Sequence, residues 1–166
     1  LVTGHRRENF GEGFKNICSA LVCVAKKYPD IELIYPVHLN PNVLNPVKKY
    51  LSSIKNIHLV KPLDYLPFLK LLDDSFLVLT DSGGIQEEAP SLGKPVLLMR
   101  DSTERPEAVE AGTVAIVGAD SDSIYSWVDM LISNNDLYEK MSRAHNPYGD
   151  GHASKKIVKI LKESQF

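Results

Sequence analysis

The chain has 166 residues, of which 43% are hydrophobic and 24% are charged, as in an ordinary globular domain with a sizeable core. The formal net charge of −2 argues against nucleic acid as the main partner, because proteins that bind nucleic acids usually carry a basic face. No apolar run approaches the roughly 20 residues that span a membrane, so we expect neither a nucleic acid nor a membrane as a partner.

Six short apolar runs along the chain predict β-strands. Most of them are continuously apolar rather than alternating, which is typical of strands buried on both faces of a parallel sheet. In chain order the runs are Leu1–Thr3, Ile31–Tyr35, Ile57–Val60, Phe76–Thr80, Pro95–Met99 and Thr113–Val117.

Amphipathic helices are predicted between these strands. Apolar residues repeat at helical spacing over 14–28, 43–54 and 124–132, the last after a polar cap region at 121–123. Strand and helix therefore alternate about five times, which predicts an α/β fold: a doubly wound parallel sheet, Rossmann-like, in one domain over residues 1–166.

The chain after Asn134 departs from this alternation. A short helical segment is expected around Leu137 and Met141, followed by a Pro- and Gly-rich turn over 146–151. A final amphipathic helix is predicted over 152–163, and its apolar face holds Ala153, Ile157, Ile160 and Leu161. This helix either docks on the same domain or crosses to a neighbouring one, and the sequence leaves both arrangements open.

The two cysteines, Cys18 and Cys23, are five residues apart in one predicted helix and so face apart, which argues against a disulfide or a metal pair. A reducing, cytoplasmic setting is therefore expected. Leu1 is not Met and stands within a strand-like run, so we expect the chain to be a fragment of a longer protein.

The strongest local signal is the run Thr80–Glu88, where a buried strand leads through a Ser-Gly-Gly turn directly into a helix. Gly83 and Gly84 allow an anion to approach the backbone closely, and the unpaired N–H groups at a helix start point toward it. Ser82 either caps the helix or donates its hydroxyl to a phosphate, and Glu88, one turn further, can accept both hydroxyls of a ribose. The segment predicts a diphosphate site, and the plainer alternative is a tight strand–helix connection with a Ser cap and acidic residues that suit the helix dipole.

Histidine and arginine residues follow other strands at the same sheet edge, where open parallel sheets bind ligands. His5 can bond a phosphate oxygen or assist a leaving group; the alternative is a surface histidine beside Arg6 and Arg7. His38 is more simply explained as a loop residue. Arg105 either forms a surface salt bridge or points its planar guanidinium at a phosphate or sugar.

Several common sites are not supported by the sequence. There is no G-x-x-x-x-G-K-[ST] and no G-x-G-x-x-G after a strand, which argues against a P-loop ATPase and a simple dinucleotide enzyme. No Cys/His cluster has the spacing of metal ligands, so neither a metal nor a cofactor is expected.

Four motifs resemble, in this order, the second half of the bacterial non-hydrolysing UDP-N-acetylglucosamine 2-epimerases. They lie at 1–9, 81–96, 103–107 and 146–151, so the resemblance extends over essentially the whole chain. It implies one half of the two-domain GT-B fold, namely the carboxyl-terminal domain that binds UDP, with an amino-terminal domain absent from the chain. It also implies that the parent enzyme is a homodimer.

The resemblance further implies roles for individual residues. Diphosphate binding falls to Ser82, Gly83 and Gly84, and the ribose hydroxyls to Glu88. A loop around Phe68 would present backbone groups to uracil, His5 would lie at the diphosphate and sugar, and Arg105 would contact the sugar side. In several bacterial members a second UDP-N-acetylglucosamine acts as an activator, and the positions that match its contacts are Arg6 and His38.

The implied reaction interconverts UDP-N-acetylglucosamine and UDP-N-acetylmannosamine by proton removal at C2, anti elimination of UDP and re-addition of UDP. The family's C2 carboxylates belong to the first domain, so we expect the isolated chain to bind UDP weakly and to be inactive. Competing readings are a GT-B glycosyltransferase domain that uses a UDP-sugar, a binding module without catalysis, and an epimerase of the hydrolysing type.

Overall fold

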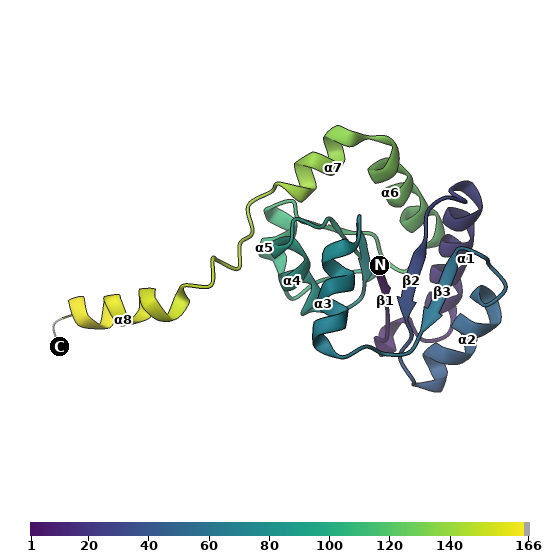
Figure 1. Cartoon of the computed structure of the whole chain (residues 1–166), viewed down its shortest axis with the longest axis horizontal. Coiled ribbons are helices and arrows are strands. Elements are labelled where there is room, and N and C mark those ends of the chain that lie inside the picture. The colour runs from purple at the N-terminus through teal and green to yellow at the C-terminus, as the bar shows by residue number, and fades with distance from the viewer. Residues whose placement is uncertain (165–166) are drawn as a thin grey trace.

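Six short parallel strands form the centre of the computed structural model, which describes residues 1–164 (Figure 1). A four-stranded sheet has the order β1-β4-β5-β6, and β2 and β3 form a second, two-stranded sheet. The strands are β1 (Val2–Thr3), β2 (Leu33–Pro36), β3 (Ile57–Val60), β4 (Val78–Thr80), β5 (Val96–Leu98) and β6 (Val114–Ile116). Each of the six predicted apolar runs therefore contains or overlaps a strand.

The two sheets adjoin at β1 and β2, which contact each other. The hydroxyl of Tyr35 on β2 donates a hydrogen bond of 3.2 Å to the carbonyl of Gly4, directly after β1. On its other side β1 pairs with β4, with Val2 opposite Leu79. The spatial order is thus β3-β2-β1-β4-β5-β6, which confirms the predicted doubly wound fold and places its switch point between β1 and β4.

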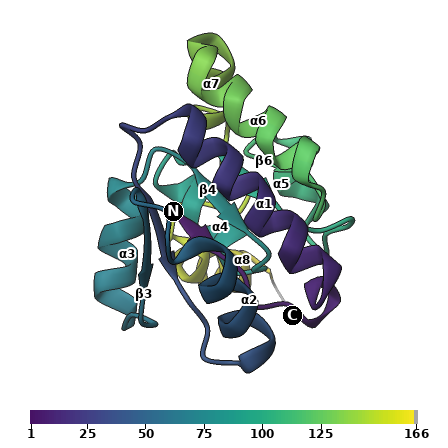
Figure 2. The same cartoon turned by 90° about the vertical axis from the view of Figure 1, so that its right-hand side faces the viewer.

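Helices cover both faces of the strands. Figures 1 and 2 show α3 on the opposite side of the strands from α1 and α6. The helical elements are η1 (Arg7–Asn9), α1 (Glu12–Lys27), α2 (Pro41–Leu51), α3 (Tyr65–Asp74), α4 (Ile85–Ser91), α5 (Pro106–Glu110), α6 (Ser121–Ser133), α7 (Asn135–Ser142) and α8 (Ala153–Glu163).

Each face has its own hydrophobic core, because successive strand residues point to opposite faces. Leu79 and Leu97 point into the larger core, which α1, α2 and α6 cover. Val78, Val96 and Leu98 point into a smaller core with side chains from α3, α4 and α5. The continuous apolar runs of the sequence are explained by this double burial.

Helix α3 is the main element that the sequence analysis did not predict. Tyr65, Phe68, Leu69 and Leu72 repeat at helical spacing there, and only Leu72 of the helix is fully buried.

The cysteines behave as predicted: Cys18 is buried and Cys23 is exposed, and burial raises the pKa of the Cys18 thiol to about 12.

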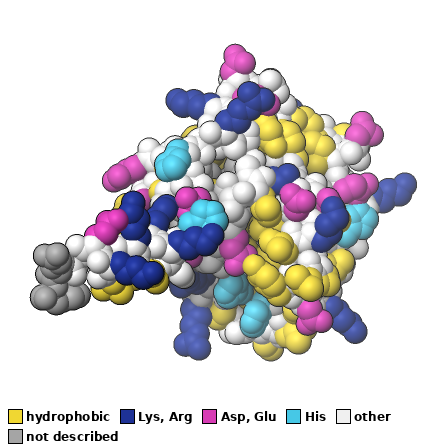
Figure 3. Space-filling model, turned by 60° about the vertical axis from the view of Figure 1, so that its left-hand side comes forward, with side chains coloured by type: hydrophobic (Ala, Val, Ile, Leu, Met, Phe, Trp, Pro, Cys, Tyr) yellow, Lys and Arg dark blue, Asp and Glu magenta, His cyan; other side chains and the backbone are white. Residues whose placement is uncertain are grey.

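The last helix, α8, extends away from the body of the domain (Figure 1). None of its residues is buried, and Ile157, Ile160 and Leu161 are each more than half exposed. Figure 3 shows lysine and hydrophobic side chains gathered on different sides of this protruding helix. In residues 1–164 it therefore does not dock on the domain, which leaves its apolar face open. Within the same residues, every helix is too short or too polar to cross a membrane.

Candidate functional site

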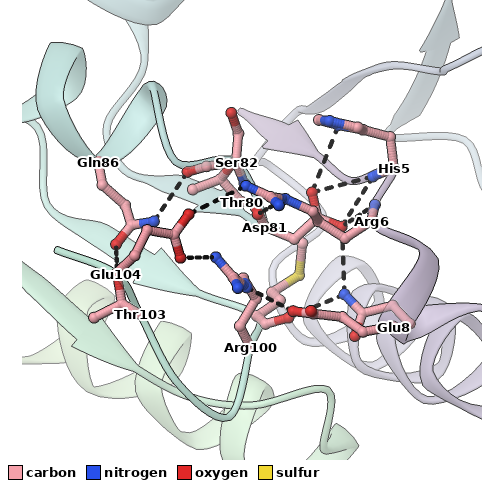
Figure 4. A network of polar contacts seen from close by, with 12 residues as sticks. His5, Arg6, Glu8, Thr80, Asp81, Ser82, Gln86, Arg100, Thr103 and Glu104 are labelled. Atoms are coloured by element: carbon pink, nitrogen blue, oxygen red, sulfur yellow. Dashed lines mark hydrogen bonds and ion pairs between the residues drawn. The ribbon is translucent and has the colours of Figure 1, made fainter.

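Polar side chains from three distant segments meet at the carboxyl ends of β1, β4 and β5 (Figure 4). His5 and Arg6 follow β1, Asp81 and Ser82 follow β4, and Arg100 lies shortly after β5. The switch point between β1 and β4 lies within this cluster, which is the position where open parallel sheets bind ligands.

Asp81 is the centre of the network, and it is fully buried. Its carboxylate accepts the backbone N–H of His5 at 2.9 and 3.1 Å, the N–H of Arg6 at 2.8 Å and the amide of Asn9 at 3.3 Å. Asn9 also donates to the carbonyl of Met99 at 3.0 Å. Through these bonds one carboxylate holds the loop after β1 against the ends of β4 and β5.

The Ser-Gly-Gly turn leads into α4 as the sequence predicts, but Ser82 does not cap the helix. Gly84 is the N-cap residue, and no side chain caps this end. Within residues 1–164, the backbone N–H groups of Gly83, Gly84 and Ile85 have no hydrogen-bond partner. These donors lie at the positive end of the helix dipole, an arrangement suited to binding an anion. The alternative of a Ser-capped connection is therefore wrong.

A cavity of about 210 Å³ adjoins this turn. The predicted site residues His5, His38, Phe68 and Ser82 all line it. The His5 and His38 rings stack with their centroids 5.6 Å apart and their planes at 21°. His38 lies in the loop between β2 and α2, as expected, and also lines the cavity.

Arg105 lies on the other side of the turn. Its Nε pairs with Glu87, and its Nη1 lies 3.3 Å from an oxygen of Glu104. A Cβ placed on Gly83 would stand 3.1 Å from that same Nη1, so the guanidinium rests against the turn. The predicted salt bridge is therefore present, and the guanidinium also stands where it can reach an anion bound at the turn.

Glu104 connects three arginines of the network. It lies 3.4 Å from Arg6 and 3.3 Å from Arg105, and it accepts a hydrogen bond of 2.7 Å from Arg100. The hydrogen bond from Arg100 is the main cause of the lowered pKa of the Glu104 carboxyl. The carboxylate therefore stays ionised at neutral pH, and these ion pairs are lost only as the pH falls through the lowered pKa.

A second buried side chain, Gln86, links the turn to the Arg105 segment. Its amide nitrogen donates to the Ser82 carbonyl at 3.2 Å, and its amide oxygen accepts the Thr103 hydroxyl at 2.6 Å. The backbone N–H of Arg105 then donates to the Thr103 oxygen at 3.0 Å. Ser82 and Arg105 are thus joined through two intermediate side chains.

Two predicted site residues, Phe68 and Glu88, lie outside the polar network. Phe68 lies in α3, not in a loop, and its backbone N–H donates to the carbonyl of Asp64 at 3.0 Å. The predicted loop around Phe68 is therefore wrong, although the residue does line the cavity. Glu88 is half-buried on α4, outside the polar network and the cavity lining.

The roles of Asp81, Gln86 and Glu104 were missed by sequence reasoning. Asp81 stands directly after a buried strand, which was a usable signal for a site residue. Gln86 has a weaker signal, because a polar residue at the start of a helix is common on a surface, whereas here it is fully buried.

A larger cavity, of about 590 Å³, lies at the opposite end of the strands, where Leu1, Leu33 and Leu77 are part of its lining. Its lining is mainly apolar, and its charged side chains are Glu32 and Asp74. Two carboxylates disfavour an anion, so this cavity is a poor candidate for a phosphate-bearing ligand.

Comparison with known proteins agrees with the geometry. Residues 1–162 match the family model for UDP-N-acetylglucosamine 2-epimerase. A probable UDP-N-acetylglucosamine 2-epimerase of Ralstonia nicotianae is 62% identical over 97% of this chain and 43% of its own length. The Escherichia coli K12 enzyme is 58% identical over 100% of this chain and 44% of its own length.

Among solved structures, the UDP-GlcNAc 2-epimerase of Neisseria meningitidis bound to UDP-GlcNAc superposes with a TM-score of 0.93 at 55% identity. That match covers 99% of this chain and 44% of the other. The chain thus spans less than half the length of the relatives it matches. The chain belongs to the UDP-N-acetylglucosamine 2-epimerase family.

Proposed function

We propose that this chain is the UDP-holding, carboxyl-terminal domain of a two-domain enzyme that interconverts UDP-N-acetylglucosamine and UDP-N-acetylmannosamine. The observation that carries the proposal is the turn after β4, which adjoins a cavity lined by His5 and Ser82. Among the described residues, the N–H groups of Gly83 and Gly84 in this turn have no hydrogen-bond partner. A diphosphate fits such donors. The Neisseria meningitidis relative, solved with UDP-GlcNAc bound, supports this choice of ligand.

Each part of the ligand has a proposed contact. The diphosphate takes the N–H groups of Gly83 and Gly84 and the hydroxyl of Ser82, with His5 beside it. Uracil lies by Phe68 across the same cavity, since both Phe68 and Ser82 line it. Arg105 faces the sugar side, and its pairing with Glu87 and Glu104 keeps its guanidinium beside Gly83.

The proposed reaction is an elimination followed by an addition. A base removes the proton from C2, the electron pair forms a C1–C2 double bond, and the C1–O bond breaks to release UDP. UDP then adds back at C1 while a proton returns to the opposite face of C2. The groups described here stabilise the departing UDP, and the acid and base at C2 would come from the other domain.

The remaining architecture of the parent is also a proposal. The apolar face of α8, with Ile157, Ile160 and Leu161 exposed, would pack on the amino-terminal domain. Burying three such side chains would stabilise the pair of domains. We further propose a homodimeric parent that works in the cytoplasm.

A second, regulatory UDP-N-acetylglucosamine is proposed at Arg6 and His38. The His38 ring is exposed and stacks on His5, and the Arg6 guanidinium lies 3.4 Å from Glu104. His38 lines the substrate cavity, and Arg6 follows His5, which also lines it, so a ligand held by both would lie next to the substrate.

The deciding experiment uses the full-length protein with UDP-N-acetylglucosamine in heavy water, and NMR follows the C2 proton of the sugar. Deuterium at C2 together with intact UDP-N-acetylmannosamine would establish reversible elimination. Free N-acetylmannosamine would move the protein to the hydrolysing class. If no exchange occurs, only UDP binding stands and a GT-B glycosyltransferase becomes the better assignment.

The isolated chain, residues 1–166, is expected to bind UDP more weakly than the full-length protein and to show no epimerisation. The reason is that it carries the diphosphate donors but not the proposed acid and base at C2. Calorimetry with UDP and the heavy-water assay measure the two properties separately. Deuterium exchange at C2 by the isolated chain would show that the acid and base at C2 do not come from another domain.

Replacing Glu88 by Ala in the full-length protein is expected to lower UDP affinity by roughly 10- to 100-fold, because hydrogen bonds to a charged group contribute about 1.5–3 kcal/mol. Affinity for 2′-deoxy-UDP should fall less, since that ligand lacks one of the two ribose hydroxyls. Glu110→Ala is the matched control, because Glu110 is exposed on α5. Equal losses for both nucleotides would argue against a contact with the ribose.

A further inference from the structure

The buried carboxylate of Asp81 has no role in the reaction as described so far. It is fully buried, yet it stands one residue before the turn that would hold a diphosphate. A buried negative charge beside an anion site opposes binding of that anion unless the carboxylate is compensated. The backbone N–H groups of His5 and Arg6 and the amide of Asn9 provide this compensation in part, and the His5 ring is the nearest titratable side chain beside them.

Both the backbone and the ring of His5 lie against the Asp81 carboxylate. The backbone N–H of His5 donates to both carboxylate oxygens, and the ring Nδ1 lies 3.6 Å from Oδ1. The His5 side chain itself is 45% exposed and lines the cavity beside Ser82. One nitrogen of the imidazole thus lies toward the buried carboxylate (Figure 4), and the partly exposed ring lines the cavity.

The neighbouring bonds hold this arrangement in place. The N–H of Arg6 and the amide of Asn9 donate to Asp81 Oδ2, and the Arg6 Nε donates to the Asp81 carbonyl at 3.2 Å. These contacts fix the backbone on either side of the carboxylate. Only the torsion angles of the His5 side chain remain to set the ring position.

We propose that Asp81 is the positioning residue for His5, pairing with its ring Nδ1 so that Nε2 is the nitrogen presented to the departing diphosphate. A carboxylate at one ring nitrogen selects the Nδ1–H tautomer and so decides what the other nitrogen can do. The separation of 3.6 Å is that of an ion pair rather than a hydrogen bond, and a small rotation about the side-chain torsion angles of His5 would shorten it. This inference rests on the proposed function of His5 at the diphosphate.

The test is a double-mutant cycle in the full-length protein with Asp81→Asn and His5→Asn. Asparagine keeps the size of the side chain and one acceptor oxygen but removes the charge. Asp81→Asn is expected to lower kcat by about 10- to 100-fold with little change in KM. In the His5→Asn background it should cause no further loss, because both changes act on the same ring.

The control is Asp129→Asn. Asp129 pairs with Lys27 and accepts a hydrogen bond from Tyr28, away from the site, and this variant should keep wild-type kcat. A loss of kcat by Asp81→Asn that persists undiminished in the His5→Asn background would overturn the proposal, because it would show a structural role alone.

A second measurement does not depend on the folding of an Asp81 variant. Full-length wild-type protein labelled with [¹⁵N]histidine should show His5 protonated at Nδ1 in NMR spectra with UDP bound, the signal being assigned by its loss in His5→Asn. A neutral ring protonated at Nε2 would refute the pairing. This result stands even if the heavy-water experiment finds no epimerisation, so the two proposals fail separately.

Discussion

Replacing His5 by Asn in the full-length protein is expected to lower kcat by about 100- to 1,000-fold, with less than about a threefold change in KM. The imidazole lines the cavity beside Ser82, and its Nδ1 lies 3.6 Å from the Asp81 carboxylate. Under the proposed function it would stabilise the charge that develops as UDP departs, and such an interaction is stronger in the transition state than in the ground state.

The measurement is the initial rate of conversion of UDP-N-acetylglucosamine over a range of concentrations. His58→Asn is a matched control, because His58 is exposed and pairs with Glu32 outside the cavity lining. An unchanged kcat for His5→Asn, or a rise in KM alone, would mean that the ring only contributes to binding.

Replacing Gly84 by Ala is expected to weaken UDP binding at least about tenfold while it raises the stability of the free protein. Gly84 has helical dihedral angles, φ −63° and ψ −36°, and a Cβ there meets nothing within 4 Å. Alanine therefore fits the free protein and gains about 0.4–1 kcal/mol from a less disordered unfolded chain. Under the proposed function, the same methyl group would stand where the diphosphate approaches the backbone.

Thermal unfolding and calorimetry with UDP measure the two opposite effects in one variant. Uridine serves as the control ligand because it lacks the diphosphate, and it should bind Gly84→Ala and the wild type equally. If UDP binds the variant as tightly as the wild type, the diphosphate does not lie against Gly84.

The sequence predicts the sheet well because the strands are short, apolar and separated by helical patterns. It also locates the turn at Ser82 and the candidate histidine, since both follow strands at the ligand-binding edge. Helix α3 is absent from the predicted elements, and the loop expected around Phe68 came from the family resemblance. The apolar residues of this segment nevertheless repeat at helical spacing, so the local pattern contains the signal for the helix.

The polar network is a different case, because its partners are far apart in the chain. Asp81 bonds residues 72 to 76 positions away, and Thr103 bonds Gln86 across 17 positions. Nothing in the neighbourhood of Gln86 in the sequence shows that its amide will be buried between a carbonyl and a hydroxyl. Such contacts depend on which strands lie next to each other in the sheet, so they can be identified only once the fold is known.

The two hydrophobic cores of the domain support different parts of the candidate site. The helices α3, α4 and α5, which carry Phe68, the glycine turn and the segment after Arg105, all rest on the smaller core. The larger core beneath α1, α2 and α6 touches none of these three elements. Stabilising substitutions are therefore best placed in the larger core, with Tyr35 and Met99 left unchanged, because these two residues bond Gly4 and Asn9 at the site.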